Sequence, residues 1–204
     1  LESYGKPLIF VDSNTLYLGH SCVTTDLEDS VITALEHFLE HHHKEIGLLV
    51  GQEETADATP LQIDPRQRAF QQFLTEKGLY EERFVAVGQF STESGYQMME
   101  QLIQTLGDDL PTAFFMASDA IAVGALRSLQ EHQIAVPDRV SLISFNDTSI
   151  AKYVFPALST VTVYTEEMGK QAIQLLRQTF QGSQPSVPCM VKLATKLTIR
   201  DSSR

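Results

Sequence analysis

Short apolar runs rich in β-branched and aromatic residues alternate along this chain with longer stretches whose apolar positions repeat every three to four residues. The first pattern is typical of buried strands and the second of amphipathic helices. The runs that predict strands are residues 8–11, 46–50, 84–87, 113–116, 140–145, 161–163 and, near the end, 190–199. The stretches that predict helices are residues 27–41, 65–77, 93–106, 119–132 and 166–180. This alternation favours βαβ units, so we expect an α/β fold with parallel sheets flanked by helices.

Two of the predicted helices carry clear start signals. Asp64 precedes Pro65, which suits a first helical position, and Gly78 follows the last turn, where a left-handed residue commonly ends a helix. Ser118 and Asp119 likewise stand where a side chain caps the next helix. These signals support the predicted boundaries.

The predicted strand ends are the first place to look for a binding site, because ligands of parallel α/β sheets bind beyond the carboxyl ends of the strands. These strand ends are followed by Asp12, the stretch 51–66, residues 88–90, residues 118–119, residues 146–147 and Tyr164. They supply carboxylates, amides, hydroxyls, an arginine and aromatic rings. Such a set suits a sugar, since the polar groups bond hydroxyls while a ring stacks on the apolar face of the sugar.

Each of these residues also has an ordinary structural interpretation. Asp12 is suited to a turn, Ser118 to a helix cap, Arg66 to a surface ion pair and Phe90 to the core. The set of residues at the strand ends, rather than any single one, therefore supports a binding site.

Composition narrows the function further. Hydrophobic residues make up 43% of the chain and charged residues 20%, which is typical of a folded globular protein. The formal net charge of −11 disfavours contact between these residues and a nucleic-acid backbone. The start of the chain shows no basic and apolar signal segment, so we expect a cytoplasmic protein, and the two distant cysteines fit a reducing setting while leaving a disulfide open.

The sequence offers little for catalysis or metal binding. It contains no G-x-S-x-G, no G-x-x-x-x-G-K-[ST] and no G-x-G-x-x-G motif after a strand, so we expect neither an enzyme nor a cofactor. His37 and His41 stand four residues apart beside His42 and His43 and could share a zinc ion, but no third ligand is evident. A solvated, cationic helix end is the simpler interpretation.

Several segments resemble one known family. Residues 114–127, FFMASDAIAVGALR, are similar to the LacI/GalR stretch in which a strand leads into N/S-D-x-x-A-x-G. Residues 136–147, VPDRVSLISFND, resemble the family's V-P-x-D-V-S-V-I-G-F-D/N-D, and PALSTV at 156–161 and EEMG at 166–169 keep its spacing. The chain is identified as a member of the LacI/GalR family of transcription regulators, closest to the galactose-operon repressors of Gram-positive bacteria.

The resemblance covers about residues 7–200 and implies a type I periplasmic-binding-protein-like fold of two Rossmann-like lobes. It places residues 1–22 and 163–192 in the N-terminal lobe and residues 23–162 and 193–204 in the C-terminal lobe. The crossings then lie near residues 22–23, 161–163 and 192–193. Relative to the family pattern, the helix-turn-helix head, the hinge and the first part of the N-terminal lobe are absent.

The resemblance also implies a sugar effector, galactose or a related sugar, in the cleft between the lobes. Arg66 matches the arginine of an R-x-x-G-F motif, with Ala69 in place of the glycine, and Asn146 stands where many members have aspartate. The expected effector-binding residues are Asp12, Arg66, Phe90, Ser118, Asn146 and Tyr164.

The partners implied by the family are operator DNA, bound through the absent head, and a second copy of the chain. Residues 121–129 and 153–155 are candidate dimer contacts, since the apolar side chains of the latter would be awkward to leave exposed. Two other functions stay open: a sugar-binding protein of a transport system, which shares the two-lobe architecture, and a small α/β enzyme.

Overall fold

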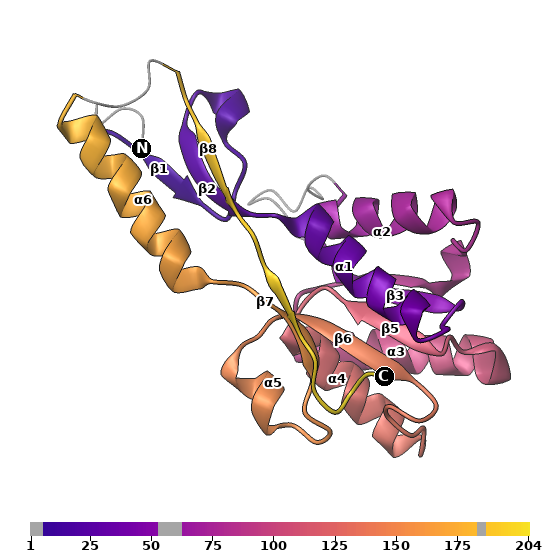
Figure 1. The fold of residues 1–204 in the computed structure, drawn as a ribbon. Helices are drawn as coiled ribbons and strands as arrows, with labels where there is room; N and C mark the ends of the chain where they lie inside the picture. The colour runs from indigo at the N-terminus through magenta and orange to yellow at the C-terminus, as the bar shows by residue number, and fades with distance from the viewer. Residues whose placement is uncertain (1–5, 53–62, 183–186) are drawn as a thin grey trace. The chain divides into compact units, whose positions relative to one another are not determined.

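The computed structural model describes residues 6–52, 63–182 and 187–204, coloured along the chain in Figure 1. The chain forms two compact units, Leu1–Asp26 with Val163–Thr195 and Leu27–Thr162 with Lys196–Arg204. We call them the small unit and the large unit. Part of the stretch after residue 51 that was considered for binding, residues 53–62, lies outside the described residues.

The small unit contains a parallel three-stranded sheet in the order β1-β2-β8. Its strands are β1 (Ile9–Val11), β2 (Ser21–Thr25) and β8 (Met190–Leu193), with a short 3-10 turn, η2 (Leu16–Leu18), between the first two. Helix α6 (Thr165–Phe180) packs against β1 and β2.

Strand β2 was not predicted, and the first crossing between the units lies further along the chain than the sequence indicated. Its sequence, SCVTT, has only one aliphatic side chain, so it lacks the apolar run that marks the other strands. It continues to Thr25 because it pairs with β8 as far as Thr25↔Leu193. The units therefore change after Asp26, Thr162 and Thr195, whereas the sequence placed the first crossing at residues 22–23 and the last at 192–193.

Cys22 lies on β2 and Cys189 immediately precedes β8, and the two do not form a disulfide. The Cys22 amide donates to the Cys189 carbonyl at 3.0 Å, while the residue in register with Cys22 is Met190. Because successive side chains alternate between faces of a sheet, the two thiols point to opposite faces. Both cysteines are free.

The large unit contains a six-stranded sheet in the order β4-β3-β5-β6-β7-β9, parallel except for the last strand. The strands are β3 (Ile46–Gly51), β4 (Val85–Gly88), β5 (Ala113–Met116), β6 (Ser141–Asn146), β7 (Ser159–Thr162) and β9 (Lys196–Thr198). The chain goes from β3 outward to β4 and then returns to β5 on the other side of β3. The carboxyl ends of β3 and β5 therefore form the switch point where such sheets bind ligands.

The helices of the large unit pack in pairs, α1 with α2 and α3 with α4 (Figure 1). The helices are α1 (Leu27–Glu40), α2 (Pro65–Glu76), α3 (Thr92–Leu106), α4 (Asp119–Glu131) and the short α5 (Ser149–Tyr153), with 3-10 turns η3 (Glu82–Phe84) and η4 (Gly107–Asp109). The α3–α4 contact is close: a Cβ on Gly124 would lie 1.9 Å from the Thr92 carbonyl oxygen.

Two expectations about these elements are corrected. The predicted strand 190–199 is two strands, since β8 belongs to the small unit and β9 to the large one. The apolar side of α4, expected as a dimer contact at residues 121–129, is buried inside the large unit, where Ile121 and Leu129 are 0% exposed. These side chains join the core that also holds Phe114 and Leu142, so they are not available to a second copy.

Candidate functional site

Arg66 lies at the first turn of α2, and its side chain is held in place by Asp64 and Ala117. Asp64 caps the helix by accepting the Arg66 amide at 2.8 Å, and the same carboxylate accepts from Nε at 2.9 Å and from Nη2 at 2.7 Å. Both side chains are only 13% exposed. Nη1 donates to the carbonyl oxygen of Ala117 at 2.6 Å, which ties the guanidinium to the end of β5.

Two aromatic rings pack against this guanidinium. Its central carbon lies 5.0 Å from the Phe90 centroid and 5.2 Å from the Phe145 centroid, within cation–π range. Phe90 follows β4, and its ring occupies the space beside Gly51, where a Cβ would approach ring carbons to 2.4 Å. The glycine at the end of β3 thus makes room for the ring.

Ser118 is a helix cap as well as a candidate ligand. Its Oγ accepts the Ile121 amide at 3.2 Å, so the structural interpretation of this residue is confirmed. It directly follows Ala117, whose carbonyl binds Arg66, and it is half-buried. The capping bond uses an acceptor position of the hydroxyl and leaves its hydrogen for another partner.

Asn146 ends β6 with a backbone that L-residues rarely adopt, at φ 106°, and Asp147 follows at φ 56°. The adjacent Thr148 is anchored by Asp119, whose Oδ2 accepts from the Thr148 amide at 2.6 Å and from its hydroxyl at 2.8 Å. The other oxygen of Asp119 accepts from Ser144 at 2.5 Å. Asp119 is 2% exposed, so a buried carboxylate at the start of α4 fixes the turn that carries Asn146.

Four of the six predicted site residues therefore lie at the carboxyl ends of neighbouring strands of the large unit. Arg66 links them, through its bond beside Ser118 and its contacts with Phe90 and with the neighbour of Asn146. Guanidinium, hydroxyl and amide groups can bond the hydroxyls of a polyol, and the exposed part of Phe90 can stack on it.

The other two predicted residues, Asp12 and Tyr164, belong to the small unit. Asp12 follows β1 at φ 62°, is exposed, and donates its amide to the Val23 carbonyl at 2.9 Å. Tyr164 precedes α6 and is 43% exposed. Their part in effector binding stays a prediction.

Sequence reasoning missed two residues that hold the site together. Asp64 was read only as a helix cap, although its position two residues before an arginine also allows an ion pair. Phe145 was hidden within the apolar run of a strand, and only the three-dimensional structure shows that its ring touches Arg66.

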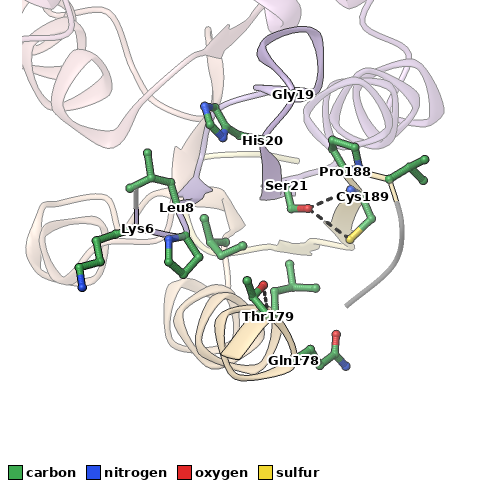
Figure 2. A pocket seen from close by; sticks show the side chains of 13 residues that line it. Lys6, Leu8, Gly19, His20, Ser21, Gln178, Thr179, Pro188 and Cys189 are labelled. Atoms are coloured by element: carbon green, nitrogen blue, oxygen red, sulfur yellow. Dashed lines mark hydrogen bonds between the residues drawn. The ribbon is translucent and has the colours of Figure 1, made fainter. Parts of the chain in front are cut away.

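Figure 2 shows a pocket of about 410 Å³ in the small unit. Its lining includes residues that immediately precede β1, β2 and β8, among them Leu8, His20 and Cys189. The Ser21 hydroxyl inside it accepts the Cys189 amide at 3.0 Å. This pocket lies at the amino ends of parallel strands, opposite to where such sheets bind ligands, so we do not assign the effector to it.

Two of the histidines at the end of α1 make local contacts through their side chains. His41 Nδ1 lies 2.8 Å from the His37 carbonyl oxygen, and His43 Nδ1 lies 2.9 Å from the Thr112 hydroxyl. Burial, and next the nearby His41, lower the pKa of both His37 and His43, which disfavours the expected cationic form of these two side chains. Within residues 6–52, 63–182 and 187–204, no three His, Cys, Asp or Glu side chains are grouped to hold a metal ion.

None of the helices in the described parts of the chain has the length and apolarity needed to cross a bilayer.

Comparison with known proteins identifies the family of this chain. The model of the periplasmic binding protein-like domain matches residues 35–203. The chain is 50% identical over 204 residues to the HTH-type transcriptional regulator GalR of Streptococcus thermophilus and 36% identical over 195 residues to the HTH-type transcriptional regulator GanR of Bacillus subtilis. These matches cover 100% and 95% of this chain but only 61% and 59% of the relatives, so the chain spans about 60% of their length.

A solved structure agrees with these matches. The transcriptional regulator CelR in complex with cellobiose aligns with 97% of this chain and 59% of its own, at a TM-score of 0.82 and 26% identity. The relatives named here are regulators rather than enzymes. The resemblance indicated by the motifs is confirmed: the chain belongs to the periplasmic binding protein-like domain family, in the form found in LacI/GalR-type transcription regulators.

Proposed function

We propose that this chain is the sugar-sensing and dimerisation domain of a LacI/GalR-type repressor of galactose or galactoside genes. It would act in the cytoplasm and bind operator DNA through a helix-turn-helix head that these residues do not include. The net charge of −11 supports a separate DNA-binding part, because such a surface repels phosphate backbones.

The observation that carries the proposal is the arrangement around Arg66. Three of the five guanidinium N–H groups bind Asp64 and Ala117, and among the described residues the other two have no partner. They belong to a rigid, half-buried group beside the Phe90 ring. Two fixed donors next to an aromatic face suit a pyranose, which presents hydroxyls at its rim and C–H groups on its face.

The charge balance favours a neutral sugar over a sugar phosphate. The Arg66 charge is already compensated by Asp64, through two hydrogen bonds to one carboxylate. Asn146 stands where many family members have a charged aspartate, and it adds an amide that both donates and accepts. A phosphate would need an uncompensated cation here, which the described residues do not supply at Arg66.

Galactose is the effector suggested by the relatives. A regulator that is 50% identical over the whole chain carries the name GalR, and a related solved regulator holds the disaccharide cellobiose. We assign effector contacts to Arg66, Phe90, Ser118 and Asn146 in the large unit and to Asp12 and Tyr164 in the small unit. Such an effector changes operator affinity only by its different affinity for different arrangements of the two units.

The proposed dimer contact rests on an exposed apolar pair after α5. Tyr153 and Phe155 are each 85% exposed, and Ile150 nearby is 45% exposed. Two large, solvent-exposed aromatic side chains two residues apart are typical of an interaction surface. We assign it to a second copy of the chain.

The proposal is tested by operator release. The present 204 residues replace the matching part of the Streptococcus thermophilus GalR, and operator binding is measured by gel shift with galactose or glucose. Galactose is expected to change operator affinity in the wild-type chimera and to have no effect in an Arg66→Ala chimera that still binds the operator. Equal operator binding by the wild-type chimera with and without galactose would overturn the proposal.

A further inference from the structure

The turn that carries Asn146 is tied to two strands by the carboxylate of the next residue. Asp147 Oδ1 accepts from Nη2 of Arg200 at 2.6 Å, and Oδ2 accepts from the Thr162 hydroxyl at 2.8 Å. The side chains of Asp147 and Arg200 are 10% and 16% exposed, so this ion pair is shielded from water. Charge-assisted bonds of this kind are short and geometrically specific.

The Thr162 hydroxyl also links Asp147 to β9 through a second hydrogen bond. Its oxygen lies 2.7 Å from the Thr198 hydroxyl. Because Thr162 has one hydroxyl hydrogen and gives it to Asp147, Thr198 must donate to Thr162. The order of donation therefore runs from Thr198 through Thr162 to Asp147.

These partners lie where the chain passes between its two units. Thr162 ends β7 and is the last residue of the large unit before the chain enters the small one. Strand β9 begins at Lys196, the first residue after the chain returns, and Arg200 follows that strand. One carboxylate thus contacts the segments next to two of the three crossings.

The backbone at the turn has an uncommon conformation. Asn146 and Asp147 both have positive φ, which is rare for L-residues in general although Asn and Asp adopt it more readily than most, and which contacts can stabilise. The Asp147 amide donates to the Thr160 hydroxyl at 3.3 Å, and Thr160 in turn donates to Asp119 at 3.0 Å. Asp119 and Asp147 therefore hold the turn from both sides, but only Asp147 reaches the residues at the crossings.

We propose that Asp147 is a positioning residue that fixes the backbone at Asn146 and couples it to the ends of β7 and β9 at the crossings. A sugar that orders Asn146 thereby orders the segments through which the two units are joined. The effect of a sugar rests on the proposed function, whereas the positioning role of Asp147 concerns the ligand-free chain.

The test compares near-isosteric variants by hydrogen exchange of backbone amides. Thr162→Val removes the hydroxyl but keeps the shape, Thr162→Ser restores the hydroxyl, and Asp147→Asn removes the charge. Asp138→Asn is the control, because Asp138 pairs with Arg204 at the surface, with side chains 64% and 68% exposed. Residues 113–116 of β5 report any general loss of stability.

Without sugar, exchange at residues 145–148 and 160–163 is expected to be about tenfold faster in Thr162→Val and Asp147→Asn, as for loss of one hydrogen bond to a charged group. Thr162→Ser and Asp138→Asn should match the wild type. Unchanged exchange at residues 145–148 in Thr162→Val, or equal acceleration in β5, overturns the positioning role. If Asp147→Asn does not fold, the Thr162 pair decides.

With galactose, wild-type protection should extend from residues 145–148 to 160–163 and 196–200, and in Thr162→Val it should stop at the turn. Affinity for galactose should fall about tenfold in Asp147→Asn. If the wild type binds no sugar, the proposed function is contradicted, but the positioning role of Asp147 is still tested by the ligand-free comparison. If galactose protects the crossing segments equally in wild type and Thr162→Val, the coupling is overturned and the proposed sugar site is unaffected.

Discussion

The Asp64 carboxylate accepts two hydrogen bonds from the Arg66 guanidinium, from Nε to Oδ1 at 2.9 Å and from Nη2 to Oδ2 at 2.7 Å. The side-on geometry fixes the plane of the guanidinium and cancels its charge. Arg83 and Glu81 form a similar unit at the surface, at 2.7 Å and with the arginine over the Phe84 ring, but with side chains about half exposed. Substitutions of Arg83 and Glu81 therefore serve as solvent-exposed controls for the same substitutions of Arg66 and Asp64.

Removing the charge of Asp64 should change which ligands bind. In Asp64→Ser the hydroxyl can still cap α2, but the Arg66 charge is uncompensated. We expect affinity for galactose 1-phosphate to rise relative to galactose, by about tenfold for a half-buried charge pair, as measured by calorimetric titration of both. Glu81→Ser should leave the ratio unchanged, and an unchanged ratio in Asp64→Ser would contradict the charge-balance argument.

Helices α3 and α4 depend on a glycine at their contact. In Gly124→Ala the new Cβ would lie 1.9 Å from the Thr92 carbonyl oxygen and 2.6 Å from the Tyr96 amide nitrogen. Because both atoms belong to the backbone, the helices must separate, and we expect a loss of about 1–3 kcal/mol in the free energy of unfolding measured in urea. Gly169→Ala, with nothing within 4 Å in α6, should instead be neutral or gain up to about 1 kcal/mol. Equal effects of the two substitutions would refute the close-contact argument.

Stability should fall in mild acid because of His37 and His43. Burial, followed by the charge of His41, lowers the pKa of both below the ordinary 6.5. Between pH 6.5 and the lowered pKa of the folded state, the unfolded chain binds more protons at these histidines than the folded chain does. Their contribution to the free energy of unfolding is therefore fully present above pH 6.5 and is lost as the pH falls from 6.5 to the folded-state pKa.

The measurement is urea unfolding at pH 7.5 and about 5.5 for the wild type and for His37→Gln with His43→Gln. The difference between the two pH values should be smaller in the double variant, since carboxylate effects are common to both proteins. A larger or equal difference in the variant would show that these histidines do not resist protonation.

The exposed aromatic pair predicts an oligomer. Charged residues in place of Tyr153 and Phe155, each 85% exposed, should convert dimers to monomers in sedimentation velocity without loss of unfolding free energy. Val87→Glu, at another exposed apolar position that is 48% accessible, is the control. A monomeric wild type, or a double variant that remains dimeric, would remove the dimer assignment from this surface.

Much of the fold could be predicted because its central strands and helices carry strong patterns. Strand β5 was predicted at its observed residues, and Asp64 with Pro65 marked the start of α2. Strand β2 could not be found from its composition, since it is stabilised by pairing with β8, which follows it by more than 160 residues. The division of residues 190–199 between two sheets is also set by tertiary pairing rather than by local pattern.

The candidate site was predictable at the level of strand ends but not of contacts. Arg66, Phe90, Ser118 and Asn146 were expected because each follows, or lies near, the end of a strand, and the order of strands brings those ends together. The roles of Phe145 and Asp147 depend on distances to residues far away in sequence, the Asp147 carboxylate meeting Arg200 at 2.6 Å. No spacing rule encodes such pairs.

The most direct test of the sensor account is calorimetric titration of galactose, with glucose, lactose and galactose 1-phosphate as comparators, into the wild-type chain and its Arg66→Ala, Phe90→Ala, Asn146→Ala and Arg83→Ala variants. We predict galactose-selective binding that weakens about 10- to 100-fold in Arg66→Ala, weakens in Phe90→Ala and Asn146→Ala, and is retained in Arg83→Ala. Equal binding by Arg66→Ala and wild type, or no binding of any of these sugars at millimolar concentration, would contradict the account.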